Sequence, residues 1–313
     1  MRKLIAAFAV LAVLGLVGFL VLTDPWTYSA LRSDGRLAPT KSARDLGNGK
    51  TLFNAGGCAS CHAVPGQDDK TRLAGGLALH TPFGTFHVPN ISPHPGDGIG
   101  AWSETAFIRA MREGVSPKGA HYYPAFPYTS YQRMAPDDLA DLFAHIKTLP
   151  SIAGVVRDHE LPFPFGIRRG LGLWKLAFLD GQVLAPDSAR SPEWNRGRML
   201  VEGPGHCAEC HSPRNLAGAI DGARRFSGGP DAEGRGYVPN ITPDKSGIGG
   251  WSKSDIAELL KTGFTPEYDS VGGSMAPVIR NTLQLSDADR SAMAEYLRSL
   301  PPIASPPRPK KTP

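Results

Sequence analysis

The chain has 313 residues, about twice the usual size of a domain, so its length favours two compact units. Its 36 glycines and 29 prolines predict much loop, short helices and few long strands. The formal charge of +5 comes largely from basic residues at the two ends, which leaves the central part near neutral and argues against a nucleic-acid partner.

The first 24 residues predict a signal anchor, which is a transmembrane helix that both targets and holds the protein. Arg2 and Lys3 precede an unbroken apolar stretch from Leu4 to Leu22. As a helix this stretch is about 28 Å long, enough to cross the hydrocarbon core of a bilayer. Because the positive charges precede it, we expect a single-pass protein of the bacterial inner membrane with everything after the helix in the periplasm. A cleaved signal peptide, with a weak site near residues 29 and 30, is the alternative, and it also exports the chain.

All four cysteines fall in two five-residue strings, Cys58-Ala-Ser-Cys61-His62 and Cys207-Ala-Glu-Cys210-His211. Short helices are predicted before each string, over residues 43–54 and 195–202. The pattern Cys-x-x-Cys-His is typical of c-type haem attachment, in which two thiols bind the haem vinyl groups and the adjoining imidazole ligates the iron. Two intervening residues make one helical turn, so both sulfur atoms face the same side of the ring.

Three other uses of paired cysteines are possible, namely two disulfides, a zinc site and a thioredoxin-like redox pair. None of them requires histidine at both fifth positions, and a thioredoxin-like unit would need a strand before the motif. The sequence therefore predicts two covalently bound haem c groups, attached through Cys58, Cys61, Cys207 and Cys210, with His62 and His211 as iron ligands.

The two halves of the sequence repeat one another. The second motif follows the first by about 150 residues, and further strings recur at about the same spacing. Val88-Pro89-Asn90-Ile91 is answered by Val238-Pro239-Asn240-Ile241, and Gly98-Ile-Gly-Ala-Trp102-Ser by Gly247-Ile-Gly-Gly-Trp251-Ser. Each half then predicts an amphipathic helix ended by glycine and a final helix followed by proline. These are residues 104–113 before Gly114, 254–262 before Gly263, 137–149, and 287–300 with Ser286 as its N-cap.

A helical unit of this kind, with haem at its first helix, a long loop around the ring and a last helix packed on the first, resembles the class I cytochrome c domain. The resemblance covers nearly all of residues 42–303 and implies a mostly α protein with tandem domains at 42–150 and 193–303. More closely, four strings are similar to the cytochrome c subunits of membrane-bound alcohol, gluconate and molybdenum hydroxylase-type dehydrogenases: Thr81-Pro-Phe-Gly-Thr85, the repeated Gly-Ile-Gly-x-Trp-Ser, Tyr123-Pro-Ala-Phe-Pro-Tyr128 and Cys210-His-Ser-Pro-Arg214. Many members of that family carry three haem domains, whereas this sequence has two and an N-terminal anchor, which leaves the partner enzyme open.

The resemblance also implies a distal iron ligand for each haem, and methionine is the usual one in electron-transfer cytochromes. Met275 is the candidate in the second half, because it lies in a loop shortly before the last helix. In the first half the family often has methionine where this sequence has Phe126, and Met134 is the nearest replacement. His121 is its competitor. The remaining methionines of the exported part, Met111, Met199 and Met293, lie on amphipathic helices and are expected to fill the core.

Supporting contacts around the haems are proposed on the same basis. The carbonyl groups of Pro65 and Pro213 are candidates to accept the ring N–H of the two ligating histidines. Trp102 and Trp251 are candidates to donate their indole N–H to haem propionates, with simple core packing as the alternative.

Residues 151–192 are too apolar for a loose linker and are expected to pack between the domains, with docking on a partner or on the membrane surface as a second hypothesis. The tail at 304–313 is rich in proline and lysine and is expected to be disordered.

The implied function is electron transfer from a periplasmic or membrane-bound dehydrogenase to the respiratory chain, with a quinone-linked chain, an oxidase or another cytochrome as acceptor. The protein would be a carrier and not itself an enzyme. The alternative is a dihaem peroxidase, which needs one iron with an open sixth position, whereas two methionine ligands would argue against it. Nothing in the sequence suggests a haem-based sensor or a purely structural subunit.

Overall fold

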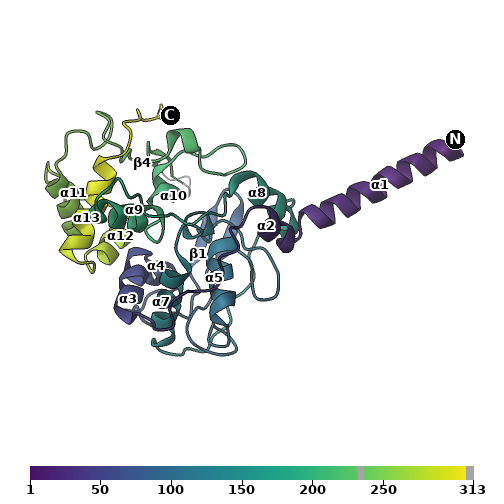
Figure 1. The fold of residues 1–313 in the computed structure, drawn as a ribbon, viewed down its shortest axis with the longest axis horizontal. Helices are drawn as coiled ribbons and strands as arrows, with labels where there is room; N and C mark the ends of the chain where they lie inside the picture. The colour runs from purple at the N-terminus through teal and green to yellow at the C-terminus, as the bar shows by residue number, and fades with distance from the viewer. Residues whose placement is uncertain (232–235, 308–313) are drawn as a thin grey trace.

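The computed structural model describes residues 1–231 and 236–307 and is mostly helical. The first helix, α1 (Arg2–Leu22), projects away from the rest of the molecule as a long arm (Figure 1). None of its residues is buried, and among the described residues it is the one helix long and apolar enough to cross a membrane. A short helix, α2 (Pro25–Leu31), follows immediately, capped by the side chain of Asp24.

The first domain contains α3 (Leu46–Ala55), α4 (Cys58–His62), β1 (Ala78–Thr81), β2 (Gly84–His87), α5 (Glu104–Glu113), α6 (Tyr128–Tyr131) and α7 (Pro136–Lys147). Helices α3 and α7 pack against each other, and β1 and β2 form an antiparallel hairpin. The core gathers around Leu52, Leu73, Ile108, Met134 and Leu139, none of which is exposed.

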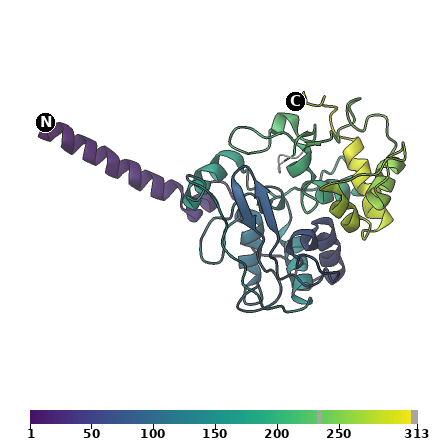
Figure 2. The same cartoon turned by 180° about the vertical axis from the view of Figure 1, so that it is seen from behind.

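The second domain repeats this plan with α9 (Pro192–Glu202), α10 (Cys207–His211), a 3-10 turn at Gly222–Arg224, β3 (Gly229–Pro230), β4 (Tyr237–Val238), α11 (Lys253–Thr262), α12 (Met275–Thr282) and α13 (Asp287–Arg298). Here α9 packs on α13, as α3 packs on α7. The two domains lie side by side, with the second on the side away from α1 (Figures 1 and 2).

Local signals explain where most of these helices begin and end. Ser103 and Ser252 cap α5 and α11, and both helices end at a glycine in the left-handed region, Gly114 (φ 59°) and Gly263 (φ 80°). Ser286 caps α13 as predicted. Two helices start elsewhere than expected, because α3 is capped by Asp45 and α9 by Ser191 with proline at its first turn.

The segment between the domains forms a 3-10 turn (Arg168–Gly170) and α8 (Leu171–Phe178), which lies beside α2 at the base of α1 (Figure 1). It contacts both domains. Leu179 packs with Tyr28 and Tyr128, and the indole of Trp174 donates a hydrogen bond of 2.8 Å to the carbonyl of Ala217 in the second domain.

The start of the C-terminal tail differs from the expected disorder. Ser305 N donates to Ser246 Oγ at 2.9 Å, and Tyr237 Oη donates to the carbonyl of Pro306 at 2.9 Å. The composition of the tail did not predict these contacts, because in each bond the partner of the tail backbone is a side chain of the second domain. Residues 308–313 of the predicted disordered segment lie outside the described residues.

Candidate haem-attachment sites

Each Cys-x-x-Cys-His string folds as a single helical turn, as its spacing predicts. The turns α4 and α10 are each preceded by a residue in the left-handed region, Gly57 (φ 58°) and His206 (φ 37°). Glycine suits position 57 for a second reason, since a Cβ there would lie 2.8 Å from Nδ2 of Asn281 in the second domain. The tight entry places both cysteines and the histidine of each motif on one short turn.

The two histidine rings are fixed in the same way. Nδ1 of His62 lies 2.8 Å from the carbonyl oxygen of Pro89, and Nδ1 of His211 lies 2.7 Å from that of Pro239. Burial lowers the pKa of both imidazoles, which favours the neutral ring. A neutral imidazole that donates through Nδ1–H keeps the lone pair of Nε2 for a metal.

The predicted carbonyl partners, Pro65 and Pro213, are wrong. The chain after each motif turns back on itself, with Gly75 N donating to His62 O and Gly228 N donating to His211 O, both at 2.8 Å. This return brings the repeated Val-Pro-Asn-Ile string beside the ring, while the carbonyl of Pro213 accepts from Asp221 N instead. Proximity in sequence suggested the wrong proline, because the acceptor is selected by the tertiary fold.

The asparagine of the same string ties the haem loop to the end of each domain. Asn90 Nδ2 donates to the carbonyl of Ile152 at 2.8 Å, and Asn240 Nδ2 donates to that of Ile303 at 2.7 Å. Sequence reasoning identified the repeated strings but missed this role. The signal was present, because a polar side chain repeated between two apolar ones indicates a shared buried hydrogen bond.

The cysteines fit haem attachment better than the other uses of paired thiols. Burial raises the pKa of the Cys58 and Cys207 thiols to about 12, which disfavours the thiolate that a metal or a redox pair needs. Among the described residues, no three His, Cys, Asp or Glu side chains are grouped to hold a metal ion. Neutral thiols on one turn, next to an imidazole with a free Nε2, match the donor set of a covalent haem.

The two candidate methionines belong to the cores of the domains in which they were sought. Met134 is fully buried in the first core, against which Cys58 also packs. Met275 is half-buried against the second core together with Cys207. The structure puts Met275 at the first position of α12, where a loop was expected.

The other candidates differ in whether their ring nitrogens already have hydrogen-bond partners in the protein. Both ring nitrogens of His121 are engaged, because Nε2 lies 2.9 Å from Thr23 O and Nδ1 lies 3.1 Å from Lys175 Nζ. Trp102 and Trp251 are half-buried against their respective cores. Within the part of the chain that the structure describes, neither indole N–H has a protein acceptor, which leaves both free for a group such as a propionate.

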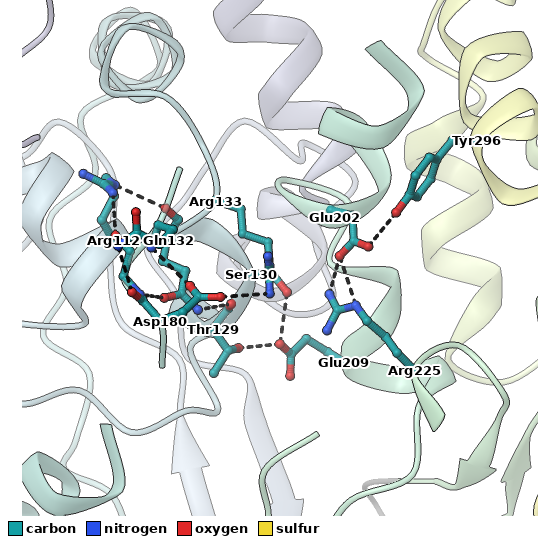
Figure 3. A network of polar contacts seen from close by, with 12 residues as sticks. Arg112, Thr129, Ser130, Gln132, Arg133, Asp180, Glu202, Glu209, Arg225 and Tyr296 are labelled. Carbon is teal, nitrogen blue, oxygen red and sulfur yellow. Dashed lines mark hydrogen bonds and ion pairs between the residues drawn. The ribbon is translucent and has the colours of Figure 1, made fainter. Parts of the chain in front are cut away.

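The two haem-attachment turns meet at the domain interface. Glu209, the third residue of the second motif, is buried and accepts hydrogen bonds from the hydroxyls of Thr129 and Ser130 in α6, the latter at 3.0 Å (Figure 3). Arg214 Nη2 donates to the other carboxylate oxygen at 2.8 Å. The equivalent residue of the first motif, Ser60, accepts from Asn281 in α12 at 2.8 Å.

These contacts are reciprocal. The first motif contacts α12 of the second domain, which begins at the candidate Met275, and the second motif contacts α6 of the first domain, which lies shortly before the candidate Met134. His206 adds a direct link between the motifs, since its Nε2 lies 3.3 Å from the carbonyl of Gly56. Figure 3 shows Glu202, Arg225 and Tyr296 as a second cluster, which belongs to the second domain alone. Each attachment turn is therefore held against a helix of the other domain at the interface.

Comparison with known proteins agrees with the repeated architecture. A family model described as cytochrome c matches residues 46–150 and again residues 195–301. A diheme cytochrome c-type protein of Cereibacter sphaeroides is 48% identical over 304 residues, which is 96% of this chain and 99% of that protein.

Two further relatives are longer proteins. The fructose dehydrogenase cytochrome subunit of Gluconobacter japonicus is 40% identical over 82% of this chain, and the gluconate 2-dehydrogenase cytochrome c subunit of Pantoea cypripedii is 35% identical over 92% of it. The aligned part spans 52% of the first and 64% of the second.

Proposed function

We propose that this chain, which belongs to the cytochrome c family through both of its domains, relays electrons from a partner dehydrogenase toward the respiratory chain. Its family and its diheme relative imply two covalently bound haem c groups. The single observation that carries the proposal is the equivalence of the two sites, each with paired thiols and an imidazole held by a proline carbonyl. When bound, haem iron supplies reversible one-electron chemistry.

The residues assigned to each site have distinct roles. Cys58 and Cys61 in the first domain, and Cys207 and Cys210 in the second, would hold the haem covalently. His62 and His211 would ligate iron through Nε2, and the Pro89 and Pro239 carbonyls orient their rings. Met134 and Met275 are the proposed distal ligands, which would raise the reduction potential relative to a second histidine. The cores that pack around Met134 and Met275 would limit the movement of these two side chains.

The partner is proposed from the relatives. Several are named as cytochrome subunits of dehydrogenases, including those acting on fructose, gluconate and alcohol, so the relatives are electron-transfer subunits. A dehydrogenase in the periplasm or on the membrane is therefore the proposed donor, and a quinone-linked chain, an oxidase or another cytochrome the acceptor. None of the relatives named here is a peroxidase, and no feature of the sites favours that alternative.

We also propose that α1 anchors the protein in the bacterial inner membrane with the haem domains in the periplasm. The support is the length and the apolar composition of α1 and its lack of buried residues, together with the basic residues Arg2 and Lys3 at its start. Export also fits haem attachment of this type, which requires the far side of the membrane.

Covalent haem content tests the assignment of the sites. The unmutated protein should carry two haem c groups per chain, and Cys58→Ala or Cys207→Ala should each lower the covalently bound amount, measured as the pyridine haemochrome after acid–acetone extraction. Met111→Leu, a buried change that conserves side-chain volume and removes neither a thiol nor a proposed iron ligand, is the control. Unchanged covalent haem in both cysteine variants would refute the proposal.

A further inference from the structure

The end of α1 is built into the folded body and is not joined to it by a free linker. Thr23, the residue that follows α1, is fully buried, and its carbonyl lies 2.9 Å from Nε2 of His121. Gly172 of α8 packs directly on it, since a Cβ at Gly172 would lie only 2.6 Å from the Cα of Thr23. A displacement of Thr23 would therefore disturb α8.

An arginine closes the same joint from the other side. Arg169 Nη2 donates to the carbonyl of Leu20 at 2.8 Å, and Arg169 Nε donates to Thr23 Oγ1 at 3.3 Å. Asp24 lies 3.9 Å from the same guanidinium. The last carbonyls of a helix lack partners within the helix and carry partial negative charge, so a cation is favourable there.

The joint continues into the first domain through Lys175. Its Nζ is completely buried and donates to the carbonyls of Glu113 and Gly114 at 2.6 and 2.7 Å, at the end of α5. It also contacts His121, which holds Thr23. An unbroken series of buried hydrogen bonds therefore runs from the last turn of α1 to the first haem domain.

Exposed apolar side chains lie on the segments that form this joint or lead into it. They are Trp26 (71% exposed), Phe163 (86%), Phe165 (41%), Ile167 (51%) and Leu173 (42%), which together we call the seating face. Trp26 lies on α2 and Leu173 on α8, both at the base of α1 in Figures 1 and 2. The other three belong to tight turns that lead straight into Arg169, with Phe165 N donating to Pro162 O and Ile167 N to Pro164 O, both at 2.9 Å.

We propose that the seating face rests on the surface of the lipid bilayer that holds α1. The inference deepens the proposed anchoring and rests on it. A helix fixed rigidly to the body obliges the membrane around it to meet the side of the body from which it emerges. Aromatic and aliphatic side chains at that level partition into the interfacial region, and the positive charges of Arg168 and Arg169 would be favourable near the phosphate groups of the lipids.

The functional consequence is a fixed orientation. A flexible tether would let the haem domains sample all angles above the membrane. The rigid joint and the seating face instead present the same sides of both domains to the bilayer and to the periplasm, so a donor and an acceptor always meet the same surfaces.

Thiol accessibility in the full-length protein carrying both haems tests this proposal, because the native cysteines are then consumed by haem. Single variants Phe163→Cys, Tyr268→Cys and Leu14→Cys would be placed in nanodiscs of phosphatidylcholine and phosphatidylglycerol and treated with a membrane-impermeant maleimide. Tyr268 is the matched control, since it is 88% exposed and belongs to the second domain, away from α1. Leu14 reports whether α1 is inserted.

We expect the thiol at 163 to react at least tenfold more slowly than the thiol at 268, and the thiol at 14 not to react. Equal rates at 163 and 268 with an unreactive thiol at 14 would overturn the seating face and leave the anchor intact. A reactive thiol at 14 would overturn the anchor, and the seating face with it.

Discussion

At the scale of single residues, the histidine rings of the two motifs are held in the orientation that the proposed role as iron ligands requires. A backbone carbonyl accepts from Nδ1 in both domains, at 2.8 and 2.7 Å. Such an acceptor sets the tautomer and the angle of the ring, and a carbonyl cannot be altered by a side-chain substitution. The sequence shows the repeated strings that supply these carbonyls, but the pairing of Pro89 with His62 depends on a return of the chain that no local pattern specifies.

Lys175 should make the stability of the protein depend on pH. Burial lowers the pKa of this amine from 10.5 to about 7, so between these values the unfolded chain binds more protons than the folded one. Stability conferred by the neutral amine is complete above pH 10.5 and is lost as pH falls to about 7. We expect the free energy of unfolding to rise from pH 7 to 10.5 in the unmutated protein and to rise less in Lys175→Met.

Denaturant titrations at several pH values measure this slope. Lys118→Met is the control, because Lys118 is exposed. The same slope in Lys175→Met and in the unmutated protein would contradict the assignment of the amine as the titrating group.

At the scale of elements, the crossing of the first and last helices defines each domain. Gly49 of α3 lies against α7, and Gly197 of α9 lies against α13. A Cβ at Gly197 would lie 1.8 Å from the carbonyl oxygen of Ala292, and one at Gly49 would lie 2.1 Å from that of Asp141. Both atoms belong to the backbone, so the helices approach as closely as glycine allows.

Gly197→Ala should therefore destabilise the second domain, even though alanine is the better helix former. The helices must separate to admit the methyl group, which we expect to cost about 1–3 kcal/mol. Gly222→Ala is the control, because no atom lies within 4 Å of the Cβ position there. Thermal unfolding followed by circular dichroism compares the two, and equal melting temperatures would show that the crossing tolerates a side chain.

Local sequence patterns predicted some helices and missed other elements, and the difference has a physical reason. The ends of α5, α11 and α13 are set by caps that lie within a few residues of them, so local patterns were sufficient. The short helices α6 and α12 and the β1–β2 hairpin were missed, because their sequences carry few local signals and they are held by contacts with distant segments. The same limit applies to Met275, which was expected in a loop and begins α12.

At the scale of the whole molecule, residues of both Cys-x-x-Cys-His turns take part in the domain interface. Sequence repetition predicted two equivalent domains but not that each motif would contact the short helix beside the methionine of the other. The third residue of each motif makes the contact, and the two differ, Ser60 in the first and Glu209 in the second. Glu209 was the signal that the sequence offered for this contact. A carboxylate in a motif that is expected to be buried requires hydrogen-bond partners.

Glu209→Ala should loosen the interface. The hydroxyls of Thr129 and Ser130 lose their common acceptor, and Arg214 loses its ion pair. Removing a charged acceptor from buried donors costs about 1–3 kcal/mol, which corresponds to amide exchange in α6 that is about 5- to 160-fold faster. Hydrogen exchange read by mass spectrometry measures it, with the exposed Glu267→Ala as the control. Unchanged protection of α6 would mean that the two domains are held together by other contacts.

The most direct test of two His/Met sites in a pure electron carrier is near-infrared magnetic circular dichroism of the oxidised protein, recorded with low-temperature EPR before and after Met134→Ala. Our account predicts two low-spin His/Met signatures in the unmutated protein and the loss of one of them in the variant. A high-spin or bis-histidine component before mutation, or two unchanged signatures after it, would contradict the account.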